Sequence, residues 1–154
     1  MGLTIYYSGR IKDCNKLRQM IEEVEDIAVL KGWDYYIFED EFEDDKFQGE
    51  MVNQNLYGIY FSPPGSEPIQ FTFASNGRLC SILEFGTNNN IQKERKIFYT
   101  IFSKTQYAGA EVHKVIIDLI RYISVKYFSE FKLTDESHYW ETNDENILKE
   151  SFIE

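Results

Sequence analysis

Apolar and polar residues alternate at the start of the chain, and apolar residues then recur at helical spacing. The alternation at residues 3–7 predicts a first strand. The next apolar residues are spaced four, three and four apart, which is typical of a helix with one buried stripe. These residues are Leu17, Ile21, Val24 and Ala28. Asp13 is a suitable N-cap and Gly32 a suitable stop, so we expect a helix between them.

Runs rich in aromatic and β-branched residues occupy the middle of the chain and predict strands. One long run, residues 69–85, is interrupted by Asn76-Gly77, a dipeptide that favours a tight hairpin, so it predicts two strands. The other predicted strands are residues 33–40, 56–62 and 96–102.

A second amphipathic helix is predicted at residues 106–128, with Ser103 and Gln106 in the relation of a capping box at its start. Residues 131–154 form an acidic tail, with a short edge strand at its start and a weak helix near 144–152. The predicted order is β-α-β-β-β-β-β-α. Consecutive strands with short connections pair antiparallel, and a helix with one apolar stripe must cover a sheet. We therefore expect one α+β domain, residues 1–154. Its two layers are a curved, mostly antiparallel sheet of about six strands, with two main helices on one face, and the tail packs on the domain.

The predicted strands carry apolar or aromatic side chains on both faces. In the second strand, for example, Tyr35 and Ile37 alternate with Tyr36 and Phe38, and Tyr57 opens another such strand. Two helices cannot cover both faces of a sheet. The second face is therefore expected either to form a surface for a partner or a second copy of the chain, or to enclose an internal cup.

The chain contains 26 acidic and 16 basic residues, a net charge of −10, which makes nucleic acid an improbable ligand. An acidic surface suits a basic protein partner, and it also serves simple solubility. No apolar run approaches the roughly 20 residues of a membrane-spanning helix, and the N-terminus does not resemble a signal peptide. We expect a cytoplasmic protein.

Residues 102–114, with the sequence FSKTQYAGAEVHK, concentrate the candidate chemistry. Lys104 and the first amides of the helix can bind an anion, and His113 can act as a donor or base, with Tyr107 beside it. Gly109 costs helix stability, so we expect it to serve close packing or the approach of a ligand. The alternative interpretation is structural: a lone histidine at the flank of an apolar stripe is more often a hydrogen-bonded residue at the edge of the core.

Two acidic runs lack the pattern of a metal site. Residues 39–45 hold six carboxylates but have no glycine at the position where a calcium loop needs one, so a charged, solvated loop is expected. Residues 22–26 place Glu22, Glu25 and Asp26 on one face of the first helix, and we expect this face to be solvated. Cys14 and Cys80 have no metal-ligand spacing, and we expect neither a metal nor another cofactor.

The block KTQYAGAEVHKVIIDLIRYISVKYF, with YWET downstream, resembles small uncharacterised bacterial proteins annotated only as hypothetical. The resemblance implies no activity, cofactor or catalytic residue.

Two classes of function follow from these patterns. The first is a non-catalytic binding or protein-interaction domain that uses an aromatic sheet face, with Tyr36 and Tyr57, for a basic protein, a second copy or a small ligand. The second is a small enzyme acting on an anionic substrate near the start of the 106–128 helix, with Lys104, Tyr107 and His113. We favour the first because it requires no coincidence of distant residues.

Overall fold

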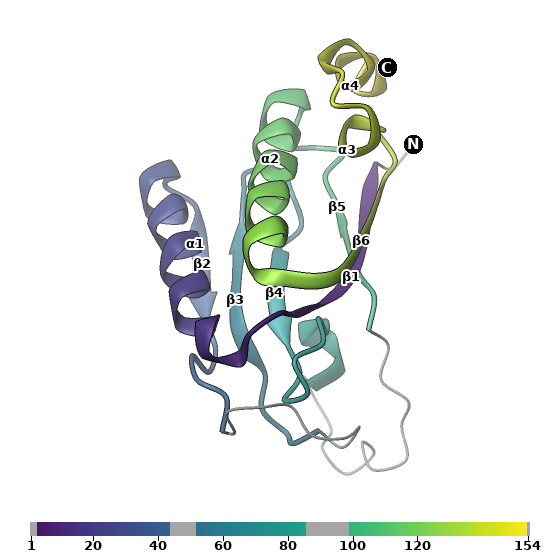
Figure 1. Ribbon diagram of the computed structural model, residues 1–154. Coiled ribbons are helices and arrows are strands. Elements are labelled where there is room, and N and C mark those ends of the chain that lie inside the picture. Colours follow the sequence, from purple (N-terminus) through teal and green to yellow (C-terminus); the bar gives the residue numbers. More distant parts are fainter. Residues whose placement is uncertain (1–2, 44–51, 86–98, 154) are drawn as a thin grey trace.

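The computed structural model describes residues 3–43, 52–85 and 99–153 and has an α+β architecture (Figure 1). The described residues form six strands in two antiparallel sheets of three, four helices and two 3₁₀ turns. In chain order the elements are β1 (Thr4–Ile11), η1 (Cys14–Lys16), α1 (Leu17–Lys31), β2 (Asp34–Ile37), β3 (Tyr57–Ser62), β4 (Ile69–Phe73), η2 (Ile82–Phe85), β5 (Ile101–Lys104), α2 (Ala110–Tyr127), β6 (Phe128–Asp135), α3 (Tyr139–Thr142) and α4 (Glu145–Ser151).

The strands do not form the expected single sheet of about six strands. Sheet A has the order β5-β1-β6 and sheet B the order β2-β3-β4, and neighbouring strands in both are antiparallel. Figure 1 shows α1 and α2 in front of the strands. Each sheet therefore has an inner face toward these helices and an outer face away from them.

The side chain of Tyr7 separates the two sheets. Its hydroxyl accepts a hydrogen bond from Gln70 N at 2.8 Å and donates one to Gln70 O at 3.0 Å. A tyrosine of the central strand of sheet A thus satisfies the backbone amide and carbonyl of Gln70 on β4, an edge strand of sheet B. Burial raises the pKa of the Tyr7 hydroxyl well above its ordinary value, against the lowering effect of its hydrogen bonds.

The expected strand after Asn76-Gly77 is reduced to a short connector between the sheets. The turn itself forms, with Gly77 at φ 83° and Ala74 N bonded to Arg78 O at 2.9 Å. Beyond it, Leu79 N donates to Gly9 O of β1 and Cys80 N donates to Thr72 O of β4, both at 2.8 Å. The chain then enters η2, so the rest of the predicted strand is absent from the sheets.

The first helix agrees with the sequence pattern and the second begins later than expected. Asp13 caps the turn before α1, and Gly32 ends α1 in the left-handed conformation at φ 73°. The capping box at Ser103 is wrong: Ser103 lies in β5, where its hydroxyl donates to Pro68 O at 2.7 Å. Helix α2 begins at Ala110. The edge strand expected near residue 131 is the eight-residue β6, at the edge of sheet A.

One large core lies between the inner faces of both sheets and helices α1, α2, α3 and α4. The tail helices contribute Tyr139 and Leu148, which are almost fully buried. A smaller core, formed by Leu56, Ala74 and Cys80, covers part of the outer face of sheet B. No described helix is long and apolar enough to cross a membrane.

Candidate functional site

The stretch from residue 102 to 114 does not bring its candidate residues together. Lys104 is exposed at the end of β5, where its amide donates to Glu67 Oε1 at 2.9 Å. The Tyr107 side chain is 82% exposed, whereas His113 is fully buried in α2. The expected pairing of Tyr107 with His113 is therefore not observed.

Gly109 serves backbone conformation rather than close approach. It is the N-cap of α2 with φ 87° and ψ 163°, a conformation that disfavours side chains with a Cβ. A Cβ built at this position would meet no described atom within 4 Å. Neither tight packing nor the approach of a ligand is needed to explain the glycine.

His113 lies at the centre of a buried group of polar side chains from three segments of the chain. Its Nδ1 is 2.8 Å from Thr105 Oγ1, and its Nε2 is 3.1 Å from Asp135 Oδ1 and 3.0 Å from Ser137 Oγ. All four residues are fully buried. We call Thr105, His113, Asp135 and Ser137 the histidine cluster.

Asp135 is the most heavily bonded member of the histidine cluster. It accepts hydrogen bonds from the Ser137 amide and hydroxyl and from the Trp140 amide. Burial opposes ionisation of this carboxyl, but the hydrogen bond and electrostatic attraction of His113, together with the bonds from Ser137 and Trp140, outweigh it and hold the pKa of Asp135 below its ordinary value.

The C-terminal tail covers the histidine cluster. The Phe152 ring lies 5.4 Å from the His113 ring, and the Ser151 hydroxyl donates to Ser137 O at 3.1 Å. The order Thr105–His113–Asp135 resembles a hydroxyl, base and acid relay, but a substrate cannot reach fully buried atoms. In this structure the histidine cluster joins the start of α2 to β6 and the tail, which is the structural interpretation of His113.

A second candidate site lies on the outer face of sheet B. Tyr36 of β2 is paired with Tyr60 of β3, and their ring centroids are 6.0 Å apart. The Phe38 ring packs edge-on against Tyr36 at 4.8 Å and lies 5.9 Å from Tyr60. Tyr36 is 54% exposed, and the other two are partly exposed. We call Tyr36, Phe38 and Tyr60 the aromatic patch.

Tyr57 does not belong to this surface, although the sequence placed it there. It is 1% exposed in the large core, stacked on Phe42 at 4.6 Å, and its hydroxyl accepts a hydrogen bond from Asn53 Nδ2 at 2.9 Å. The alternation within β3 explains this: Tyr57, Ile59 and Phe61 point inward, and Tyr60 points outward.

The outer faces are only partly aromatic. On sheet A, Tyr6 and Phe102 are exposed, but their neighbours on the same face are polar. These neighbours are Ser8, Lys104, Lys132 and Thr134. The expectation of apolar side chains on both faces thus holds for the aromatic patch and the small core, and not for the outer face of sheet A.

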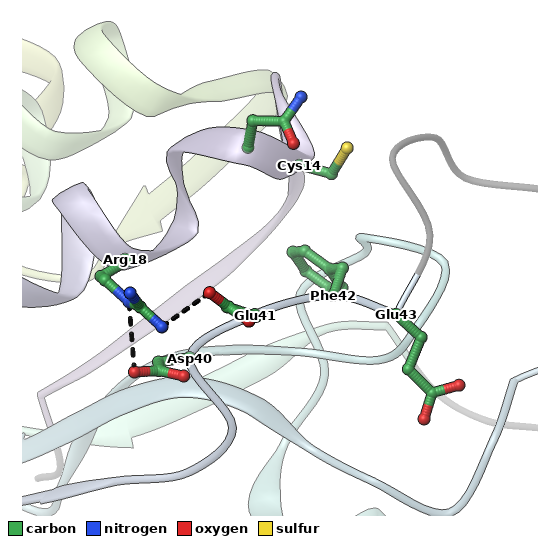
Figure 2. Close-up of a pocket in the computed structure, with 7 residues that line it drawn as sticks. Cys14, Arg18, Asp40, Glu41, Phe42 and Glu43 are labelled. Carbon is green, nitrogen blue, oxygen red and sulfur yellow. Dashed lines mark hydrogen bonds and ion pairs between the residues drawn. The ribbon is translucent and has the colours of Figure 1, made fainter.

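The acidic loop after β2 docks on the start of α1. Arg18 forms ion pairs with Asp40 and Glu41, drawn as dashed lines in Figure 2. The nitrogen to oxygen distances are 3.4 and 2.7 Å, and these residues line a hollow of about 410 Å³. Glu43 points away from Arg18 (Figure 2). Residues 44 and 45 of the predicted solvated loop lie outside the described residues. Among the residues that are described, no group of three or more His, Cys, Asp or Glu side chains is arranged to hold a metal ion.

Sequence reasoning missed several members of both groups. Asp135 and Ser137 lie in the segment for which the sequence predicts a short edge strand and an acidic tail, and Thr105 lies between the predicted strand 96–102 and the predicted helix 106–128. The D-x-S spacing at 135–137, which lets an aspartate accept from the hydroxyl and amide two residues later, was a usable signal. Tyr60 could have been found from alternation within its strand.

Comparison with known proteins provides no family to set beside this geometry: no family model, no curated protein and no solved structure matches the chain.

Proposed function

We propose that the protein is a non-catalytic protein-interaction domain whose aromatic patch docks a basic protein partner. The observation that carries the proposal is the exposure of three mutually packed rings on a sheet face. Tyrosine rings in such a position provide large contact area at low entropic cost and are enriched at the centres of protein interfaces.

The charge around the aromatic patch supports a basic partner. Asp34 is exposed on β2 and, by strand alternation, shares the face of Tyr36. Glu39 follows the patch along the chain and is also exposed. Neither carboxylate forms an ion pair with a described residue. An arginine or lysine of a partner can therefore pair with them and also stack on a tyrosine ring.

The same charges disfavour self-association. In a symmetric dimer through the aromatic patch, the face that carries Asp34 would be buried against the same face of the second copy, in a chain of net charge −10. Like charges at an interface weaken association, so we expect a monomer in the absence of a partner.

The alternative, an enzyme using Lys104, Tyr107 and His113, has less support. His113 is fully buried and bonded to Thr105 and Asp135, whereas Tyr107 lies in solvent. An enzyme would require the tail to leave the histidine cluster.

The test compares Tyr36→Ala with Tyr6→Ala. Tyr6 is a partly exposed tyrosine on the outer face of sheet A and is a matched control. Proteins captured by the wild-type chain are purified, and their binding to each variant is measured by calorimetry. We expect to find a basic partner. Its binding free energy should weaken by about 2 kcal/mol or more for Tyr36→Ala and should not change for Tyr6→Ala. Equal affinity for both variants, or a dimer that only Tyr36→Ala dissociates, contradicts the proposal.

A further inference from the structure

Basic residues gather in one hollow on the outer face of sheet A, although the chain as a whole is acidic. The hollow has a volume of about 200 Å³ and is lined by Ser8, Gly9, Arg10, Arg78, Glu130 and Lys132. It is distinct from the aromatic patch, which lies on sheet B.

The backbone places the two arginines side by side. Arg10 of β1 and Arg78 of the connector form an antiparallel bridge, so they lie directly opposite each other with side chains on one face. Lys132 of β6 lies opposite Ser8, on the same face two residues along β1. Like charges directly opposite each other are unfavourable, so this arrangement costs stability unless an anion is present.

The hollow offers little compensating negative charge. Among the described residues, Glu130 is the one acidic residue that lines it, 3.5 Å from Arg10 Nη1, and its side chain is 73% exposed. An ion pair with that exposure contributes little. The buried Nε of Arg10 has no hydrogen-bond partner among the described residues. Three cations therefore face one weakly held carboxylate.

Both arginines are held in place without a ligand. The guanidinium of Arg78 lies 4.4 Å from the centroid of the Tyr99 ring, over its face. Nη2 of Arg10 donates to Asn76 O at 3.3 Å, and Asn76 Nδ2 donates to the Tyr99 hydroxyl at 3.2 Å. A preorganised pair of guanidinium groups loses less entropy when it binds.

A β-bulge shapes the floor of the hollow. The register of β1 with β6 shifts between Ser8 and Arg10, and Glu130 adopts φ 53°, which is uncommon for a non-glycine residue. Gly9 permits the close approach of the strands, because a Cβ there would lie 3.1 Å from the Phe131 backbone. Residues in sparsely populated backbone conformations cluster at functional sites.

From these observations we propose that Arg10, Arg78 and Lys132, with the Ser8 hydroxyl, form a binding site for the phosphate group of a small phosphomonoester. The planar guanidinium groups match the oxygens of a phosphate, and the lysine adds a third positive charge. The hollow is smaller than the pockets that enclose drug-sized ligands, so we expect it to enclose the phosphate group and little more.

The test follows backbone amide resonances by NMR during titration with inorganic phosphate and with glycerol phosphate, at constant ionic strength maintained with chloride. Three variants are compared: Arg10→Gln, Arg78→Gln and Lys104→Gln. Lys104 is exposed on the same outer face, opposite Thr4 at the other end of β1, and is the matched control. Thermal unfolding establishes that each variant folds. If Arg10→Gln does not fold, the proposal is tested with Arg78→Gln alone, because Arg78 is exposed.

We expect saturable shifts around Ser8, Arg78 and Lys132, and at least a roughly tenfold weaker affinity in the arginine variants but not in Lys104→Gln. Equal losses in all three variants, or the absence of saturable shifts at constant ionic strength, would overturn the proposal. Tighter binding of a phosphoserine peptide than of glycerol phosphate would overturn the assignment to a small molecule.

Discussion

Nε2 of His113 lies 3.1 Å from Oδ1 of Asp135, and both side chains are fully buried. The two residues are 22 positions apart, on α2 and at the end of β6. Their contact therefore fixes where the main helix sits on sheet A and where the C-terminal tail begins.

Asp135→Asn is expected to lower the free energy of unfolding by about 3 kcal/mol, because it breaks a buried, hydrogen-bonded pair. Since the folded pKa of Asp135 is lowered, its contribution to stability is present above the unfolded pKa and is lost as pH falls through the folded pKa. Urea unfolding at several pH values measures this. Asp26→Asn, an exposed control on α1, should retain the wild-type acid dependence. If the free energy of unfolding of Asp135→Asn depends on pH in the same way as that of the wild type, Asp135 does not supply this acid-dependent stability.

Tyr7→Phe tests the separation of the two sheets. The change removes one hydroxyl and leaves the backbone amide and carbonyl of Gln70 without their partner, so we expect a loss of about 1–3 kcal/mol in urea unfolding. Tyr6→Phe is the matched control, because Tyr6 is the adjacent tyrosine of β1 and its ring is partly exposed on the outer face, beside Phe102. Equal stability of the two variants would mean that the Tyr7 hydroxyl does not hold the edge of β4.

Glu23 joins α1 to α2. It accepts hydrogen bonds from the Tyr122 hydroxyl at 2.6 Å, from Lys126 Nζ at 2.9 Å and from the Tyr127 hydroxyl. Desolvation opposes its ionisation, but the bonds from Tyr122 and Lys126 outweigh it and lower the pKa of Glu23.

Glu23→Gln is therefore expected to destabilise the fold by about 1 kcal/mol near neutral pH, a modest amount because the group is partly solvated. The loss should shrink as pH falls through the lowered pKa of Glu23, since the wild-type carboxylate is then protonated too. Thermal unfolding of Glu23→Gln beside Glu22→Gln, an exposed neighbour, measures the difference. A loss that is independent of pH would assign the effect to packing instead.

Local patterns were sufficient for the elements that are specified locally. The stripe from Leu17 to Ala28 with Gly32 as its stop gave α1. Alternation gave β2 and β3, and Asn76-Gly77 gave a turn. The α+β class followed from these elements and is confirmed.

Longer-range contacts decided what the sequence could not specify. The start of α2 was misplaced because Ser103 bonds to Pro68, 35 residues earlier, rather than capping the helix. The strands divide into two sheets, and the contact between these sheets through the Tyr7 hydroxyl and Gln70 joins residues 63 positions apart. The surroundings of His113 depend on Asp135 in the same way. Such pairings have no local signature, because each depends on how the elements pack.

If Tyr36 belongs to a docking surface, its substitution should weaken binding but have little effect on the stability of the fold. Tyr36 is 54% exposed and contributes little to the core, so Tyr36→Ala is expected to change the free energy of unfolding by less than about 1 kcal/mol. Tyr57→Ala, at a core tyrosine, should cost about 3 kcal/mol or more. Chemical denaturation of both variants measures this contrast. Similar losses would place Tyr36 in the core and remove it from the surface.

The most direct measurement of the central claim is an NMR titration of the protein with a short arginine-rich peptide, observed at the aromatic ring resonances. We expect saturable shifts at Tyr36, Phe38 and Tyr60, weakened by salt, and none at Tyr6 and Phe102. Shifts of equal size at both groups of rings, or none at either, would contradict a docking surface for a basic partner on the outer face of sheet B.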